Sequence, residues 1–262
     1  MNKKIAIIGG GNLGIAIAEG LLKSGFVNPG HLIITKRNIK TLQEIEQRGV
    51  MVTSNNEEAV QYADLIVLSV KPYQIKEVIQ QIQPFLNSTR HILVSVVTGV
   101  TLSDMQDWAG ENISLVRAMP NTAIAIQESM TCLSSLLTSQ DQLDYVHDLF
   151  SQLGRVALVD EKLMDASTVL GACGIAFALR YIRASIQGGI EIGFDAKTAA
   201  LIAAQTVKGA AELLIQKGAH PEQEIDKVTT PKGCTIAGLN EMEHRGFSSS
   251  LIMGIKASYD RI

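Results

Sequence analysis

The segment KIAIIGGGNLG near the start of the chain constrains the fold most strongly. Residues 4–8 form a short apolar run rich in β-branched residues, typical of a buried parallel strand. The run ends in Gly9-x-Gly11-x-x-Gly14, and residues 15–23 continue with helical periodicity. Gly9 permits a tight turn, Gly11 lets the backbone approach a pyrophosphate, and Gly14 permits close packing of helix on strand. This context predicts a dinucleotide-binding βαβ unit rather than merely a tight turn.

Strands and helices continue to alternate through the N-terminal half. Further strands are expected at 32–35, 50–53, 65–69, 92–97 and 114–117, with helices at 39–48 and 73–82 among them. Such alternation indicates a parallel sheet with helices on both faces. The predicted fold class is therefore α/β, a Rossmann-like, mainly parallel sheet domain followed by an all-helical dimerisation domain. We place the first domain at residues 1–160 and the second at 161–262.

The C-terminal half is Ala-rich and predicted to be helical. We expect long helices at 165–187 and 195–217, the second with Asp195 as its N-cap. The second helix carries apolar residues on more than one side, so it must be buried. A domain of about 100 residues has little room to bury two such helices alone. We expect a second subunit to cover them, in a homodimer or an oligomer of dimers; the alternative is an intrachain bundle.

The end of the second strand bears on the choice of cofactor. NAD-binding proteins usually carry an acid there to hold the ribose 2′-hydroxyl. This chain has Thr35-Lys36-Arg37-Asn38 instead. A hydroxyl and two cations suit a 2′-phosphate, which favours NADPH, with NADH possible. The alternative is a solvated basic turn.

Three other strand ends carry distinctive residues. They read Val70-Lys71-Pro72, Val97-Thr98-Gly99 and Ala118-Met119-Pro120-Asn121. Ligands of open α/β sheets bind at the carboxyl ends of the strands. Each group could be an ordinary turn, since Gly, Pro and Asn form turns. Three groups together favour a lined cofactor cleft.

Composition excludes several classes of protein. The net charge of −3 over 262 residues gives no reason to expect nucleic acid or an anionic membrane as a partner. The longest uncharged stretch, residues 166–179, is shorter than the roughly 20 apolar residues of a membrane span. Three cysteines without C-x-x-C spacing and five scattered histidines argue against a disulfide framework or a metal site. The N-terminus lacks a signal-type cleavage site, and we expect a cytoplasmic protein.

Near the C-terminal end, VTTPKGCTIAGL places two hydroxyl residues, a Pro, a Lys and a Gly before a predicted helix. The free N–H groups and positive dipole of a helix N-terminus can hold a carboxylate. The alternative is an ordinary loop with an N-cap.

Six stretches, taken in their order, resemble the pyrroline-5-carboxylate reductase family, and the resemblance covers nearly the whole chain. They are AIIGGGNLGIAIAEGL, ADLIVLSVKP, VSVVTGVTL, RAMPNT, HPEQEIDKVTTPKGCTIAGL and EMEHRGF. The resemblance implies a Rossmann-like domain, and a helical domain that interleaves with a partner subunit to form the active site. It implies hydride transfer from NAD(P)H to the C=N carbon of 1-pyrroline-5-carboxylate, giving L-proline in the last step of proline biosynthesis.

The resemblance also assigns site residues. The loop Thr230–Thr235 would hold the substrate carboxylate, and Thr235 would hydrogen-bond the ring nitrogen as the catalytic residue. Asn56 matches an asparagine near the adenine-side ribose. The expected substrate site comprises Thr230, Lys232, Gly233, Cys234, Thr235 and Cys173. The expected cofactor site comprises Gly9, Gly11, Asn12, Leu13, Thr35, Lys36, Arg37, Asn56, Val70, Lys71, Pro72, Thr98, Gly99, Ala118, Met119, Pro120 and Asn121, with no metal.

Two stretches depart from the family pattern. Residues 171–177 read GACGIAF where the family usually has S-G-S-G-P-A-Y, and Lys232 stands at a usual Gly position that would need positive φ. The pocket is either rebuilt for a different cyclic imine or belongs to a variant with the same reaction, which we favour. Cys173 and Cys234 are interpreted as inert rather than reactive thiols.

Two further alternatives stay open. A β-hydroxyacid dehydrogenase would need a lysine on the long helix, and none lies between Met164 and Glu191. A catalytically inactive NADPH-binding regulator has only the altered 171–177 segment in its favour.

Overall fold

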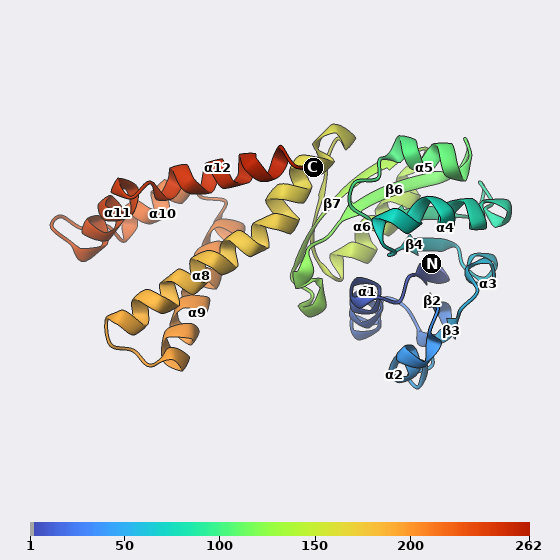
Figure 1. The fold of residues 1–262 in the computed structure, drawn as a ribbon, viewed down its shortest axis with the longest axis horizontal. Helices are drawn as coiled ribbons and strands as arrows, with labels where there is room; N and C mark the ends of the chain where they lie inside the picture. Colours follow the sequence, from blue (N-terminus) through green and yellow to red (C-terminus); the bar gives the residue numbers. More distant parts are fainter. Residues whose placement is uncertain (1–2) are drawn as a thin grey trace. The chain divides into compact units, whose positions relative to one another are not determined.

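The computed structural model describes residues 3–262 and divides the chain into two compact units. The first comprises the residues up to Cys173 together with Ile262, and the second comprises Gly174–Arg261. The sequence predicts that the helical dimerisation domain begins at residue 161, and that boundary stays a prediction. Figure 1 shows the strands in the first unit, and only helices in the second.

The first unit is built on one eight-stranded sheet with the order β3-β2-β1-β4-β5-β6-β7-β8. Neighbouring strands are parallel except β6 and β7, which are antiparallel. The order reverses between β1 and β4, which is the topological switch point of a Rossmann fold. The strands are β1 (Ile5–Ile8), β2 (Leu32–Thr35), β3 (Met51–Thr53), β4 (Leu65–Leu68), β5 (Ile92–Ser95), β6 (Ser114–Met119), β7 (Ser129–Leu136) and β8 (Gly154–Leu158).

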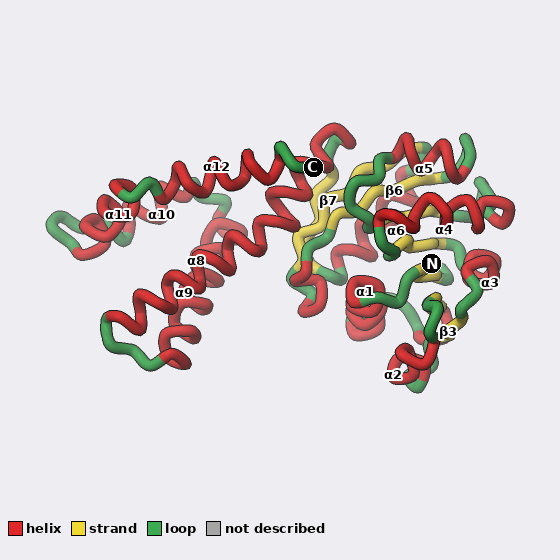
Figure 2. Tube along the Cα trace, in the orientation of Figure 1, coloured by secondary structure: helices red, strands yellow, loops and turns green. Residues whose placement is uncertain are grey.

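Both faces of this sheet are buried under helices (Figure 2). Ile5 and Ile7 of β1 face a core that includes Ile17 of α1, whereas Ala6 and Ile8 face a second core that includes Ile79 of α4. Apolar residues on both sides of a strand explain the continuous apolar run in the sequence. The helices of this unit are α1 (Asn12–Lys23), α2 (Gln43–Glu46), α3 (Asn56–Tyr62), α4 (Ile75–Ile82), α5 (Leu102–Ala109), α6 (Gln140–Ser151) and α7 (Met164–Ser167).

The long helix expected at 165–187 is interrupted. A π-helical segment, Thr168–Cys173, lies between α7 and α8 (Gly174–Glu191). This segment includes the first three residues of GACGIAF, the stretch that departs from the family pattern. Such π-segments are rare and occur frequently at functional sites.

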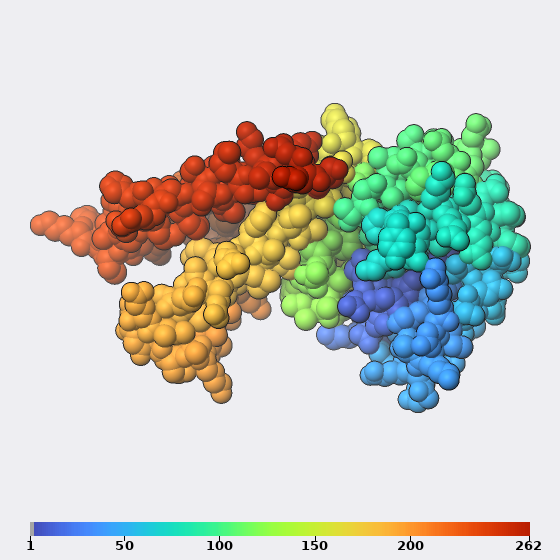
Figure 3. Space-filling view, viewed as in Figure 1, coloured from blue at the N-terminus to red at the C-terminus, as the bar shows by residue number. Residues whose placement is uncertain are grey.

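The second unit contains α8, α9 (Ala196–Lys217), α10 (Pro221–Lys227), α11 (Cys234–His244) and α12 (Phe247–Tyr259). Asp195 is the N-cap of α9, because its carboxylate accepts from the N–H groups of Lys197 and Thr198. The helices α8 and α9 pack closely, since a Cβ on Gly189 would lie 3.1 Å from the Cβ of Ala199. Over most of their length, α8–α9 and α11–α12 form two separate arms (Figure 3), joined by the Tyr181–Phe247 ring contact.

The helical unit buries very little apolar surface on its own. Among residues 174–261, all of which the structure describes, the buried apolar side chains are Ala199 and Ala203. Ile192, Leu201 and Ile252 are 78%, 70% and 58% exposed. A domain needs a shared hydrophobic core, so these helices require cover from outside the unit.

Two helical stretches in the described part of the chain are long and apolar enough to cross a membrane by length and composition. They are Glu161–Glu191 and Ala196–Lys217, which contain 18-residue windows with a mean hydropathy of 1.4 and 1.3. The expectation from the uncharged run at 166–179 missed them, because both helical stretches continue past charged residues. Contact with a second subunit would satisfy the same apolar faces.

Candidate functional site

A cleft of about 1050 Å³ lies at the switch point of the sheet. It is formed by the carboxyl ends of β1, β2, β4 and β5 and by residues of α1, α3 and α4. Twelve of the expected cofactor residues line it: Gly9, Gly11, Asn12, Leu13, Thr35, Lys36, Arg37, Asn56, Val70, Lys71, Pro72 and Thr98.

The three glycines of the β1–α1 turn have distinct geometries. Gly9 has φ 110°, and a Cβ there would lie 2.3 Å from the carbonyl oxygen of Ser69. A Cβ on Gly14 would lie 2.2 Å from the carbonyl oxygen of Gly9, whereas one on Gly11 would meet nothing within 4 Å. Gly9 and Gly14 are therefore needed for the turn itself, and Gly11 leaves the backbone open to a ligand.

The N-terminus of α1 faces this cleft without a side-chain cap. Gly11 is the N-cap residue, it makes no side-chain bond, and the first turn contains no acidic residue. The first N–H groups of a helix have no intrahelical acceptor, and the dipole favours an anion there. This end of α1 can hold a pyrophosphate.

The end of β2 supplies polar and cationic groups to the same cleft. Thr35 is 3% exposed, and its hydroxyl donates to Oδ1 of Asn56 at 2.7 Å. Nδ2 of Asn56 donates to Oε1 of Gln81 at 3.1 Å. Within residues 3–262, neither Lys36 nor Arg37 forms an ion pair, so both charges are available to an anionic ligand.

Five expected cofactor residues are not among those that line the cleft: Gly99, Ala118, Met119, Pro120 and Asn121. Ala118 and Met119 are buried in β6. The Asn121 side chain is engaged elsewhere, because its Oδ1 accepts from the N–H of Ala123 and its Nδ2 donates to the carbonyl of Gly171 at 3.3 Å. Asn121 thereby ties the end of β6 to the π-helical segment. The cofactor role of these five residues stays a prediction.

The cleft also contains residues outside the expected cofactor set: Ile8, Gly10, Asn38, Ser54, Ser69, Gln74, Glu77, Val78, Gln81, Val96 and Val97. Asn38 and Val97 stand in strand-end groups that the sequence singled out. Ser69 and Val96 directly follow β4 and β5, so the strand-end rule could have found them. Gln74, Glu77, Val78 and Gln81 lie in or just before α4. Only the docking of α4 against the sheet brings them to the cleft.

The loop expected to bind the carboxylate forms a tight turn before α11. The N–H of Gly233 donates to the carbonyl of Thr230 at 2.9 Å, with Pro231 and Lys232 between them. Lys232 has φ 60°. Proline followed by a residue of positive φ is the pattern of a type II turn, in which glycine is the usual third residue.

The first turn of α11 is open to a ligand. Gly233 is its N-cap and forms no side-chain bond. A Cβ on Gly233 would lie 2.5 Å from Oγ1 of Thr230, so the turn accepts only glycine there without movement. Cys234 is exposed and Thr235 is half-buried. The N–H groups of this turn can donate hydrogen bonds to a carboxylate.

The cysteines and other metal-binding residues form no evident cluster. Cys132, Cys173 and Cys234 are free thiols. Among residues 3–262, no group of three or more His, Cys, Asp or Glu side chains is arranged to hold a metal ion.

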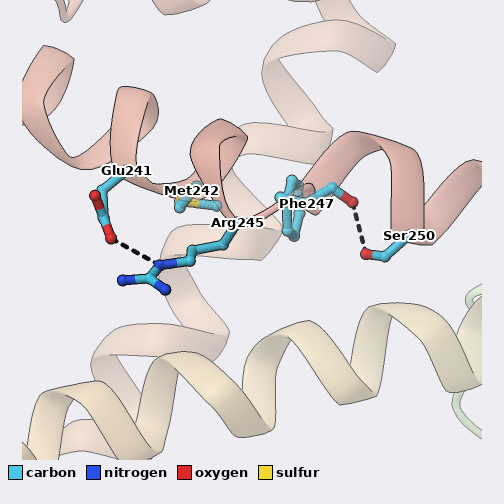
Figure 4. A pocket seen from close by; sticks show the side chains of 5 residues that line it. All are labelled: Glu241, Met242, Arg245, Phe247 and Ser250. Carbon is cyan, nitrogen blue, oxygen red and sulfur yellow. Dashed lines mark hydrogen bonds and ion pairs between the residues drawn. The ribbon is translucent and has the colours of Figure 1, made fainter.

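A second, smaller hollow of about 350 Å³ lies where α11 meets α12 (Figure 4). Its lining residues are Glu241, Met242, Arg245, Phe247 and Ser250. Nε of Arg245 donates to Oε1 of Glu241 at 2.9 Å, so the two charged side chains of the hollow pair with each other. All five side chains are exposed, and we assign this hollow to the uncovered apolar surface of the helical unit.

Comparison with known families gives matches to both parts of the chain. Residues 161–262 match the family described as pyrroline-5-carboxylate reductase dimerisation. Residues 4–99 match the family described as NADP oxidoreductase coenzyme F420-dependent.

Relatives match nearly the whole chain. Pyrroline-5-carboxylate reductase 1 of Dictyostelium discoideum is 44% identical over 98% of this chain, which spans 49% of that relative's length. Pyrroline-5-carboxylate reductase 2 of the same organism is 40% identical over 99% of this chain and 92% of its own length.

Solved structures share the fold over its full extent. A pyrroline-5-carboxylate reductase from Coxiella burnetii has a TM-score of 0.94 at 29% identity, covering 100% of this chain and 97% of that chain. Pyrroline carboxylate reductase of Plasmodium falciparum, solved with NADP bound, has a TM-score of 0.87 at 26% identity, covering 99% and 97%.

Proposed function

Because this chain belongs to the pyrroline-5-carboxylate reductase family, we propose that it reduces 1-pyrroline-5-carboxylate to L-proline with NADPH. This reaction is the last step of proline biosynthesis. The observation that carries the proposal is 40% identity to a named reductase over 99% of this chain and 92% of the relative. The cleft at the switch point and the open turn before α11 supply the two kinds of site that the reaction needs.

When bound, NADPH supplies the hydride that reduces the C=N carbon. The backbone of Gly11, Asn12 and Leu13 at the start of α1 would hold its pyrophosphate. Thr35, Lys36, Arg37 and Asn56 would hold the adenosine ribose and its 2′-phosphate. We assign Gly9, Val70–Pro72, Thr98, Gly99 and Ala118–Asn121 to the remaining cofactor contacts.

The loop before α11 would bind the substrate. The N–H groups of Gly233 and Cys234 would hold the carboxylate, with Thr230, Lys232 and Cys173 as further substrate residues. The hydroxyl of Thr235 would hydrogen-bond the ring nitrogen. If the imine arrives protonated, hydride addition neutralises an iminium and the chain need supply no strong acid. Positioning then accounts for most of the catalysis, an effect that can reach about 7–11 kcal/mol.

Self-association through the C-terminal helices is supported by the dimerisation family match and by their uncovered apolar faces. We propose a homodimer, or an oligomer of such dimers, in which the partner covers α8 and α9. On this proposal the two apolar helices contact protein rather than lipid, and the protein is cytoplasmic.

The test is the loss of NADPH absorbance with 1-pyrroline-5-carboxylate, in wild type and Thr235→Ala. We expect turnover in wild type and a fall of about 100-fold or more in kcat/KM for the variant, with NADPH affinity kept. Thr89→Ala, at an exposed threonine in a turn of the sheet unit, serves as the matched control. Wild type that binds NADPH but does not turn over this substrate would contradict the proposal and direct the search to other cyclic imines or to regulation.

A further inference from the structure

Three side chains from different elements form a continuous hydrogen-bonded series in the cofactor cleft. The hydroxyl of Thr35, at the end of β2, donates to Oδ1 of Asn56 at the start of α3. Nδ2 of Asn56 donates to Oε1 of Gln81, in the last turn of α4. All three residues line the cleft. We call them the Thr35–Asn56–Gln81 series.

In this series the Asn56 amide turns its oxygen to Thr35 and its nitrogen to Gln81. A threonine hydroxyl has a single hydrogen, and Thr35 uses it at 2.7 Å on the Asn56 oxygen. Thr35 is 3% exposed, so little water competes for this bond. At the other end of the amide, Gln81 takes one of the two N–H groups. Asn56 keeps one N–H and the second lone pair of its oxygen for a ligand, so it can still donate to an acceptor.

An amide held this way favours a ribose that carries a 2′-phosphate. An ionised phosphate only accepts hydrogen bonds, whereas a ribose 2′-hydroxyl can donate or accept. Both can therefore accept from an N–H of Asn56, but the bond to the phosphate is charge-assisted and roughly twice as strong as the bond to the neutral hydroxyl. Lys36 and Arg37 add two cations in the same cleft. Glu77, the one acid among the described residues that line the cleft, has no part in the series.

We propose that Thr35 and Gln81 determine the preference for a 2′-phosphate over a 2′-hydroxyl, and that they do so by orienting Asn56. They are positioning residues, and Asn56 is the group that binds. This inference rests on the use of NADPH in the proposed function. It names Gln81, a residue that no strand-end argument selects, as a specificity determinant.

Calorimetric binding of adenosine 2′,5′-bisphosphate and of 5′-AMP tests this without turnover. We expect Thr35→Val to weaken binding of the bisphosphate by about tenfold, equal to about 1.4 kcal/mol, and to change 5′-AMP binding by less than about twofold. Gln81→Leu should act in the same direction, and Thr35→Ser should restore affinity. Gln80→Leu, beside Gln81 on α4, lies outside the lining residues and serves as the matched control.

A double-mutant cycle separates orientation from direct contact. If Thr35 acts through Asn56, Thr35→Val has no further effect on bisphosphate affinity in an Asn56→Ala background. An equal loss in both backgrounds would overturn the inference, because Thr35 would then contact the phosphate itself. Unchanged affinity in both single variants would overturn it as well.

Failure of the proposed function can be distinguished from failure of this inference. Wild type that binds neither the bisphosphate nor NADPH would contradict both proposals. Wild type that reduces the substrate with NADPH, while Thr35→Val and Gln81→Leu bind the bisphosphate normally, would sink the inference alone. Circular dichroism and thermal unfolding of each variant confirm that the fold is kept.

Discussion

Two single residues, Lys232 and His91, have conformations or surroundings that are unfavourable for their type, and the sequence reveals only the first. Lys232 was identified as the departure from a family glycine, and the structure gives it a positive φ of 60°. That conformation brings Cβ close to the following carbonyl, at a cost of roughly 1–2 kcal/mol for a residue with a side chain. His91, which sequence patterns did not select, is 2% exposed at the start of β5.

Replacing Lys232 with glycine should relieve this strain. We expect Lys232→Gly to raise the free energy of unfolding by up to about 1 kcal/mol, because glycine avoids the Cβ clash but loses about 0.5–1 kcal/mol of chain entropy. Denaturant unfolding measures the change. Lys208→Gly, in the middle of α9, is the matched control and should destabilise by about 1 kcal/mol. A comparable loss for Lys232→Gly would contradict the argument from φ.

Burial of His91 should make stability depend on pH. Burial, followed by the nearby Arg90 charge, lowers the pKa of His91 below 6.5. Its Nδ1 accepts from the N–H of Asn87 at 2.9 Å, which requires the neutral ring. The unfolded chain therefore takes up the proton first, and stability is lost as pH falls from the ordinary pKa toward the lower folded pKa.

Urea unfolding between about pH 8 and pH 5.5 tests this expectation. Wild type should lose stability toward the acid end, and His91→Gln should show a flatter dependence. His147, which is 42% exposed, gives the matched control His147→Gln, the same substitution at an exposed histidine. An identical slope in wild type and His91→Gln would rule His91 out as the cause.

At the scale of elements, the sequence predicts helices and strands that have a local pattern of apolar residues. It misses elements that are recognisable only from their packing against other parts of the chain. The parallel strands β1, β2, β4 and β5 were expected because both faces are buried and the runs are apolar. The antiparallel strand β7 was missed, since SMTCLSSL is rich in hydroxyl groups and is recognisable only when paired with β6. The helices α5 and α6 begin with capping boxes at Thr101–Asp104 and Ser139–Gln142, a local signal that could have found them.

The candidate site divides in the same way. Gly9, Gly11 and Thr35 follow strands, and the strand-end rule finds such positions because parallel strands finish on one edge. Glu77 and Gln81 reach the cleft from α4, whose position depends on the packing of Ile75 and Ile79 against the sheet. The local sequence does not predict where α4 packs on the sheet, so it could not place Glu77 and Gln81 in the cleft.

One buried charge joins three elements of the sheet unit. Arg117 on β6 is 2% exposed and pairs with Glu161 at 3.0 Å and with Asp165, in α7, at 2.8 Å. Oε1 of Glu161 also accepts from the N–H of Leu102 at the start of α5. The two acids are partly exposed and can be hydrated, whereas the guanidinium cannot.

Removing the acids should therefore cost more than removing the arginine. The double variant Glu161→Gln/Asp165→Asn leaves a buried, uncompensated cation, and we expect a loss of about 3–5 kcal/mol in the free energy of unfolding. Arg117→Met should lower the free energy of unfolding by clearly less than the double variant does. Glu241→Gln, which breaks an exposed pair with Arg245, is the control and should change stability by under about 1 kcal/mol. Equal losses for Arg117→Met and the double variant would refute this asymmetry.

At the scale of the whole molecule, the exposed apolar surface of the helical unit requires a partner. The family match to a dimerisation domain covers residues 161–262 and thus every helix of this unit. Sequence reasoning reached the same expectation from α9, because small and apolar residues surround that helix. Which faces meet depends on a second chain and cannot be derived from one sequence.

Light scattering on the purified protein tests self-association. Wild type should have a mass at least twice the 28.2 kDa of one chain. Leu201→Glu places a charge on a side chain that is 70% exposed in α9, and we expect a smaller species with a Tm that falls on dilution. Tyr73→Glu, an equally drastic change at an exposed residue of the sheet unit, should keep the wild-type mass. A Leu201→Glu protein of unchanged mass and Tm would place the contact elsewhere.

The near-absence of buried side chains within α8–α12 has a consequence for cells that make two versions of this chain. Helices without a core of their own would be completed only by another copy, so the two versions would exchange and form mixed assemblies. Co-expression of the two versions with a tag on one of them would reveal the exchange, because the untagged version would be recovered with the tagged one.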